Sequence, residues 1–297
     1  MKVRTKAFTM LTIAMLIFGS IGLFVRYIPL PSSVIAFVRA FIGVIFLVMI
    51  ITLRKAKLDQ KALKRNFIIL LLSGCAIGFN WILLFESYRY TSVAVSTLCY
   101  YMAPVIVTLL APLVLKESIS FKRISCAIIA VVGVALISGL LGGSTLSAEE
   151  NKGILFGLGA ASLYASAILL NKRLRQIEAM DRTIFQLLIA AIVLLVYNVL
   201  SYDLKSIAWQ PSVAILLLVV GIVHTGLAYY LYFGSMVHLS GQTIAIISYI
   251  DPVIAVMISV VLLREPFNIY TVIGAVAILG AAALSELPHK EEMNNDN

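Results

Sequence analysis

The sequence predicts an all-α membrane protein of ten transmembrane helices, arranged as two inverted five-helix repeats with both termini in the cytoplasm. Three observations carry this prediction: the composition, the apolar runs and an internal repeat. Of the 297 residues, 61% are hydrophobic and 12% are charged, and the mean hydropathy is +1.03. Soluble domains are about one quarter charged. The composition therefore excludes a soluble globular protein.

Apolar runs of about 20 residues, the length that crosses the hydrocarbon core, recur along the chain. They occupy roughly residues 7–27, 33–53, 67–88, 92–114, 121–141, 153–171, 183–201, 212–234, 241–263 and 269–287. The longest connections lie around 54–66, 142–152, 172–182 and 202–211. None is long enough to fold alone, so we expect no extramembrane domain for a nucleotide or a soluble substrate.

Basic residues are unevenly distributed between alternate connections. If Lys2, Arg4 and Lys6 lie inside, 17 of the 23 lysines and arginines fall on the inner side and five on the outer side. The positive-inside rule then places both termini in the cytoplasm of a multi-pass cell membrane protein. The net charge of +9 is explained by topology, and no nucleic-acid partner is predicted. The first run lacks an A-x-A cleavage pattern and is interpreted as a retained span.

The second half of the chain repeats the first at an offset of 148 residues. CYYMAPVIVTLLAPLVLKE (99–117) aligns with ISYIDPVIAVMISVVLLRE (247–265), so that Tyr101 meets Tyr249 and Pro104 meets Pro252. The repeats are assigned to 1–145 and 146–297. Because each holds five spans, an odd number, the second is inverted in the membrane. Inverted repeats are common in secondary transporters, whose substrate sites lie near the midplane between the repeats.

These features resemble the EamA-type members of the drug/metabolite transporter superfamily. The stretch FESYRYTSVAVSTLCYYMAPVIVTLLAPLVLKES (85–118) and its counterpart 233–266 carry the resemblance, which extends from about residue 8 to 287. It implies secondary transport, often export, of a small metabolite such as an amino acid, without naming one. One departure is Phe18, where many members have a tryptophan before the glycine.

Asp251 is the first candidate for function, because ionisable residues inside a span are rare and costly. It lies about 15 Å into the ninth span, near the midplane. Its repeat counterpart is Ala103, so the repeat itself does not demand a carboxylate. Low dielectric disfavours the charged form, which suits proton binding. Neutralising a cationic substrate, bonding to Tyr or His neighbours, and capping backbone freed at Pro252 are the alternatives.

Arg39, in the second span, is the candidate for binding a substrate carboxylate through its bidentate donor fork. The alternative is a side chain that snorkels outward to the membrane surface. Gln186 stands at about the same place in the second half. A substrate held by both Arg39 and Asp251 would carry both signs of charge, as an amino acid does.

Two further groups are candidates for proton coupling besides Asp251. Glu86 either pairs with Arg89 three residues later on the same helix, or pairs with Arg39. His224 titrates near neutral pH, or is a hydrogen-bonded core residue. The sequence does not decide between the two roles of Glu86 or between the two roles of His224.

Aromatic and amide side chains near the predicted midplane are candidates for lining a substrate cavity. They are Trp81, Asn80, Tyr100, Tyr101 and Tyr249. The alternative roles for the aromatic rings are packing within the bundle and a place in the interfacial belt.

Pro104 and Pro252 each remove a backbone hydrogen bond at equivalent depth. The pair predicts a kink in both halves, which is either static or part of a gate.

No motif predicts an enzyme, a cofactor or a metal site. H-E-x-x-H, G-x-S-x-G and an ATP-binding loop are absent, so an intramembrane enzyme is the weaker hypothesis and transport must draw on gradients. An exporter of cationic amines or drugs is the closer alternative. The expected partners are a metabolite and the bilayer. The glycine pairs 74/78, 139/143 and 153/157 leave a homodimer open, and Glu117 and Glu265 are interpreted as structural caps.

Overall fold

The computed structural model describes residues 2–56, 58–116, 120–138, 141, 147–202 and 210–286. The helices of the first half are α1 (Lys2–Arg26), α2 (Ser32–Leu53), α3 (Gln60–Arg65), α4 (Phe67–Tyr90), α5 (Val93–Tyr100), α6 (Ala103–Leu115) and α7 (Phe121–Ile137). Those of the second half, with η marking π-helix, are α8 (Ala148–Asn171), α9 (Ala179–Ser201), α10 (Pro211–Gly221), η2 (Ile222–Leu227), α11 (Ala228–Met236), α12 (Gly241–Ser248), α13 (Ile250–Met257), η3 (Ile258–Leu262) and α14 (Ile269–Glu286).

Five single helices, and two segments that join consecutive helices, are long and apolar enough to cross a membrane. In the described part of the chain seven segments reach that length, and Ile246–Leu262 and Ile269–Ser285 are shorter apolar helices. Large apolar side chains such as Leu113 and Leu200 point outward, with 80% and 81% of their surface exposed. Apolar side chains tolerate such exposure in lipid, so the fold confirms the prediction of an all-helical membrane protein.

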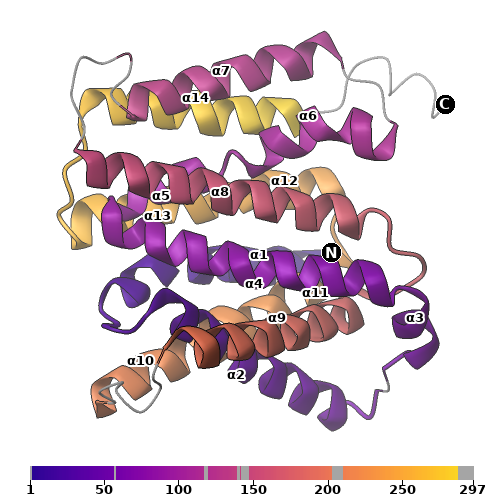
Figure 1. The fold of residues 1–297 in the computed structure, drawn as a ribbon. Coiled ribbons are helices and arrows are strands. Elements are labelled where there is room, and N and C mark those ends of the chain that lie inside the picture. Colours follow the sequence, from indigo (N-terminus) through magenta and orange to yellow (C-terminus); the bar gives the residue numbers. More distant parts are fainter. Residues whose placement is uncertain are drawn as a thin grey trace.

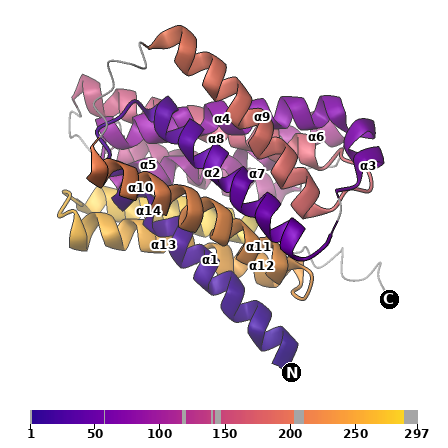
Figure 2. The same cartoon turned by 90° about the horizontal axis from the view of Figure 1, so that it is seen from below.

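The two halves interleave. α4 packs against α8 and α9, α1 against α11 and α13, and α7 against α14. Figure 1 shows α7 and α14 along one edge of the bundle, with α2, α9 and α10 along the opposite edge, which Figure 2 views from below. The core therefore lies between helices of different halves, where a shared cavity can form.

The segment that holds each shared proline is broken. α5 ends at Tyr100 and α6 begins at Ala103, with Pro104 in its first turn. In the same way α12 ends at Ser248 and α13 begins at Ile250, before Pro252. A proline cannot donate to the carbonyl four residues earlier, which accounts for a break on its N-terminal side. The helix is thus interrupted near its middle in both halves.

The glycine pairs at the helix surfaces serve contacts within this chain. A side chain at Gly74 would collide with Ile189 of α9, and one at Gly157 would collide with Cys99 of α5. Close helix packing therefore uses these glycines inside the bundle. Gly139, Gly143 and Glu117 lie outside the described residues.

Candidate functional site

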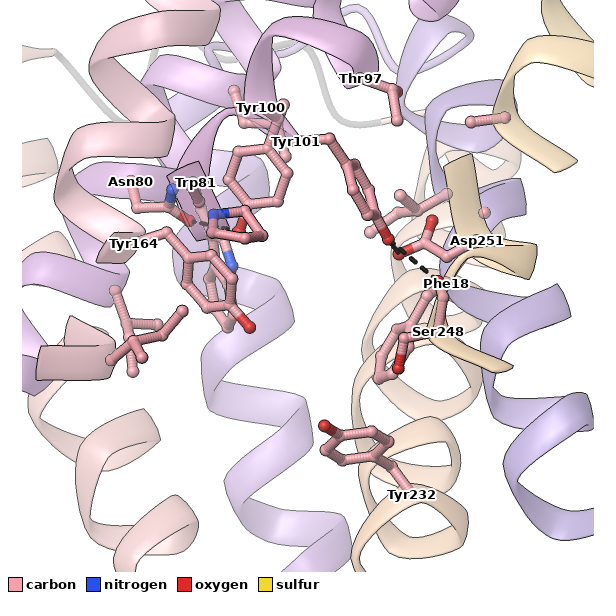
Figure 3. A pocket seen from close by; sticks show the side chains of 18 of the residues that line it. Phe18, Asn80, Trp81, Thr97, Tyr100, Tyr101, Tyr164, Tyr232, Ser248 and Asp251 are labelled. Carbon is pink, nitrogen blue, oxygen red and sulfur yellow. Dashed lines mark hydrogen bonds between the residues drawn. The ribbon is translucent and has the colours of Figure 1, made fainter. Parts of the chain in front are cut away.

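A cavity of about 800 Å³ lies between the two halves (Figure 3). Helices α1, α2, α4 and α8 and both broken segments contribute to its wall. Its wall is rich in aromatic rings, which come from Phe18, Trp81, Tyr88, Tyr100, Tyr101, Tyr164, Tyr229, Tyr232 and Tyr249. A space of this size with an apolar wall and a few polar groups is typical of a small-molecule site.

Equivalent positions of the two halves line the cavity together. At the offset of 148 the lining pairs are Trp81/Tyr229, Leu84/Tyr232, Tyr88/Met236, Tyr100/Ser248, Tyr101/Tyr249 and Ala103/Asp251. Phe18 of α1 and Tyr164 of α8 also line the cavity, one from each half. The cavity therefore lies where the repeats meet.

Asp251 faces Tyr101 across the junction of the halves. It occupies the first turn of α13, where the helix dipole favours negative charge. The Tyr101 hydroxyl lies 3.0 Å from Asp251 Oδ2 and 3.2 Å from the Ser248 carbonyl (Figure 3). Ser248 stands four residues before Pro252, so its carbonyl is the one that proline leaves without an intrahelical donor. A tyrosine of one half thus serves the broken helix of the other.

One hydroxyl proton serves these two acceptors. If Asp251 is ionised, its carboxylate and the Ser248 carbonyl compete for the proton of Tyr101. If Asp251 is protonated, its carboxyl group can donate to the tyrosine oxygen while the hydroxyl donates to Ser248. All three groups are satisfied only in the second arrangement. The hydrogen-bond geometry therefore links the protonation of Asp251 to the break between α12 and α13.

Arg39 is buried in the opposite part of the wall, with 5% of its surface exposed. Its guanidinium carbon lies 4.0 Å from the centroid of the Trp81 ring, and its Nε donates to Thr225 Oγ1 at 2.8 Å. The described residues offer it no carboxylate within ion-pair distance, because the recorded pairs are Arg26–Glu265 and Arg89–Glu86. The outward-snorkelling alternative does not describe this buried side chain.

Tyr100 and Asn80 form a second polar corner of the cavity. The Tyr100 hydroxyl lies 3.4 Å from Asn80 Oδ1, and Asn80 Nδ2 donates to the Ala160 carbonyl at 2.6 Å. The Tyr100 ring stacks on Tyr164 with centroids 5.3 Å apart. Figure 3 places these residues with Trp81 on one side of the cavity, facing Tyr101 and Asp251 on the other.

Three predicted site residues lie off the cavity wall. Glu86 lies 3.5 Å from Arg89, so the helix-surface ion pair is formed and pairing with Arg39 is not. His224 is 2% exposed, with Nε2 3.0 Å from Ser20 Oγ and Nδ1 3.4 Å from the Val219 carbonyl. Pro252 adjoins Asp251 without lining the cavity. Asp251, Arg39, Tyr101, Tyr249, Tyr100, Trp81, Asn80 and Pro104 all line it.

Glu265 ties the two halves together at the end of the bundle where α1 ends. It pairs with Arg26 at 3.3 Å and accepts from the Val93 backbone at 2.8 Å, at the start of α5. Ser259 also donates to it, at 2.6 Å. Arg26 in turn donates to the carbonyls of Tyr88 and Thr91. Glu265 is therefore both a cap for α5 and a contact between the halves.

Sequence reasoning missed Thr225 and did not select Phe18, Tyr164, Tyr229 or Tyr232. Tyr229 and Tyr232 carried a usable signal, because they are the repeat counterparts of Trp81 and Leu84, whereas Phe18 and Tyr164 have no lining counterpart at this offset. Thr225 carried none: a threonine in an apolar run is ordinary, and its contact depends on the π-helix of η2.

Membrane-length helices and one cavity shared by two repeated halves are the features of an integral membrane transport protein. The chain belongs to the EamA-like transporter family, which matches residues 5–139 and again residues 151–287. This confirms the family resemblance read from the sequence.

Several curated relatives cover nearly the whole chain. YxxF of Bacillus subtilis, named an uncharacterized transporter, is 32% identical over 99% of this chain and 93% of its own length. An uncharacterized transporter of Archaeoglobus fulgidus is 23% identical over 93% of this chain and 94% of its own. A solved crystal structure aligns with a TM-score of 0.66 at 17% identity, covering 95% of this chain and 96% of that one, which supports the fold.

Proposed function

We propose that the protein is a secondary active transporter of the cytoplasmic membrane that exports a small amphipathic metabolite, such as an amino acid, by alternating access. One observation carries the proposal: Arg39 and Asp251, of opposite charge and from opposite halves, line the same cavity without an ion-pair partner among the described residues. Buried charges are costly unless they are paired. A substrate with a carboxylate and an ammonium group would pair both.

The same proposal assigns the topology. Ten spans form two inverted repeats, 1–145 and 146–297, and both termini face the cytoplasm. The sidedness of the basic residues supports this orientation. The broken helices support the inverted arrangement, because transporters of this build commonly place half-helix ends at the substrate site.

Proton coupling enters through Asp251. Protonation would satisfy Tyr101 and Ser248 together, and deprotonation would leave one acceptor unserved. Each protonation state would therefore favour a different geometry at the break before Pro252. Movement of the segments at Pro104 and Pro252 would then gate the cavity. Glu86 and His224 have less support as coupling groups, because neither lines the cavity.

A second candidate is the export of cationic amines or drugs. The aromatic wall favours it, since tyrosine and tryptophan rings attract cations, and Asp251 would supply the counter-charge. This alternative gives Arg39 no partner and would place like charges in one cavity. The amino-acid class is therefore preferred.

Counterflow into proteoliposomes tests the proposal. Proteoliposomes that contain the purified protein are preloaded with unlabelled leucine, isoamylamine or 4-methylpentanoate. These three compounds share one apolar body and differ in their charged groups. We expect leucine to exchange saturably and without chemical change, and the rate to depend on pH. Asp251→Asn should remove the pH dependence of exchange. Arg39→Gln should slow the exchange of the compounds that carry a carboxylate.

Three outcomes would contradict the proposal. Exchange of isoamylamine alone would favour the amine alternative. Unchanged rate and pH dependence in Asp251→Asn would remove the coupling role of the carboxylate. Conversion of a solute into a different compound would indicate an enzyme. Glu86→Gln is the matched control, because it removes a carboxylate from the same bundle but away from the cavity.

A further inference from the structure

The π-helix η2 brings span eight against α2 at the depth of Arg39. Residues 222–227 form this π-helix between α10 and α11. π-Helical turns inside longer helices are frequent at functional sites. Here the turn presents one side chain to each of two first-half helices: His224 to Ser20 of α1 and Thr225 to Arg39 of α2.

Close packing fixes the distance between η2 and α2. A Cβ at Gly43 of α2 would lie 2.6 Å from the Thr225 methyl carbon, and one at Gly226 would lie 2.5 Å from the Phe46 ring. Any larger residue at these two positions would push the helices apart. The glycines therefore allow the short reach between Thr225 and the side chain of Arg39.

The Thr225 hydroxyl is oriented to accept. Its own proton is donated to the Val220 carbonyl, five residues earlier, at 3.1 Å. A lone pair of the same oxygen then accepts from Arg39 Nε at 2.8 Å. Thr225 is fully buried, so water does not compete for this contact. One donor of the guanidinium is thereby occupied, and the guanidinium carbon lies over the Trp81 ring, 4.0 Å from its centroid.

This arrangement leaves the far edge of the guanidinium available. Its Nε is bound to Thr225, and Arg39 forms part of the cavity wall. The two terminal amino groups make the fork that binds a carboxylate with two parallel hydrogen bonds. We propose that Thr225 is the positioning residue that aims Arg39 into the cavity, and that it sets selectivity for substrates with a carboxylate. This inference rests on the proposed function.

Trp81 provides a direct reporter. The sequence has two tryptophans, Trp81 and Trp209, so Trp209→Phe leaves Trp81 as the sole fluorophore. In this background, before any ligand is added, Thr225→Val should shift the Trp81 emission in the same direction as Arg39→Gln. Thr225→Ser, which keeps the hydroxyl, should match the parent. An unchanged emission in Thr225→Val would overturn the inference without reference to any substrate.

Ligand titrations then test selectivity in nanodiscs, with leucine, 4-methylpentanoate and isoamylamine as probes. Thr225→Val should lower the binding affinity for leucine and 4-methylpentanoate about tenfold, the order of one charge-assisted hydrogen bond. The affinity for isoamylamine should stay within about twofold of the parent value. Thr225→Ser should recover the parent affinities. Ser73→Ala is the matched control. It removes the hydroxyl that accepts from Gln186 of the other half, and Gln186 does not line the cavity.

The remaining outcomes separate the two proposals. Equal weakening of all three probes by Thr225→Val would make Thr225 a structural residue only and overturn the inference. An effect of Ser73→Ala as selective as that of Thr225→Val would overturn it too. If the parent protein binds none of the probes and exchanges none in counterflow, the proposed function fails, whatever the emission of Trp81 shows about Thr225.

Discussion

The two halves share a scaffold and differ in its chemistry, as Arg39 and Gln186 illustrate. Each residue lies on the second long helix of its half and bonds to a hydroxyl on the third span of the other half. Arg39 of α2 donates to Thr225, and Gln186 of α9 donates to Ser73 at 2.6 Å. Gln186 also donates to Asn171 at 2.6 Å and is absent from the cavity wall. The two residues therefore occupy similar places in their halves, but only Arg39 lines the cavity.

Asp251 and Ala103 show the same division from the other side. Both line the cavity, both stand one residue before a proline, and only one can carry charge. Each half thus contributes one charged group to a wall in which six pairs of equivalent positions take part. In the function proposed above, the symmetric scaffold supports two alternating states and the unequal charges orient one substrate within it.

The largest expected effect comes from moving the carboxylate between the halves. Asp251→Ala should lower the counterflow rate about a hundredfold, near 2.7 kcal/mol. Adding Ala103→Asp should restore activity to within about tenfold of the parent, because the two positions face the same space. Proteoliposome counterflow at several pH values measures both. A double variant as inactive as Asp251→Ala alone would show that the positions are not equivalent.

Moving the arginine from position 39 to position 186 should not restore substrate binding in the same way. Arg39→Gln should weaken carboxylate-bearing substrates about thirtyfold, about 2 kcal/mol, because the fork is lost. Adding Gln186→Arg should restore nothing, since residue 186 is committed to Ser73 and Asn171 away from the cavity. Substrate affinity reported by Trp81 emission is the measurement. Recovery in the double variant would contradict the difference described between the halves.

Tyr101 and Tyr249 are repeat counterparts, and only Tyr101 is predicted to couple protonation to the helix break. Tyr101→Phe should lower the rate about tenfold, because the carbonyl freed by Pro252 loses its donor, and should flatten the pH profile of counterflow. Tyr249→Phe is the matched variant and should keep the parent profile. Equal effects of the two substitutions would refute the assignment.

The smallest effect is expected where the halves meet at Arg26. Glu265→Gln removes a partly exposed ion pair worth about 1 kcal/mol, which should raise the rate of labelling at this end of the bundle about fivefold. Ser32, which is 1% exposed beside Arg26, reports the change when Ser32→Cys is labelled by a maleimide in a variant lacking Cys75, Cys99 and Cys126. Glu86→Gln, at a pair within one helix, is the control. Slower labelling in Glu265→Gln would contradict this role.

The class of protein, the positions of the apolar helices and the equivalence of the halves can be predicted from the amino-acid sequence alone. These follow from local properties: a run of apolar residues needs lipid or a core, and a repeated motif is read by alignment. Even Asp251 was selected in this way, because a carboxylate among apolar residues stands out without any contact being known. The breaks near Pro104 and Pro252 were also expected, since proline acts on its own helix.

Which polar residues share a cavity becomes visible only in the folded bundle. Arg39 and Gln186 are similar candidates in sequence, yet packing turns one to the cavity and the other to Ser73. Thr225 acquires its role from a π-helix and from glycines on two helices that are far apart in the chain. Glu86 and His224 are titratable candidates in the sequence, but in the structure Glu86 contacts Arg89, His224 contacts Ser20, and neither lines the cavity. Contacts between the halves depend on helix rotation and approach, which no local pattern encodes.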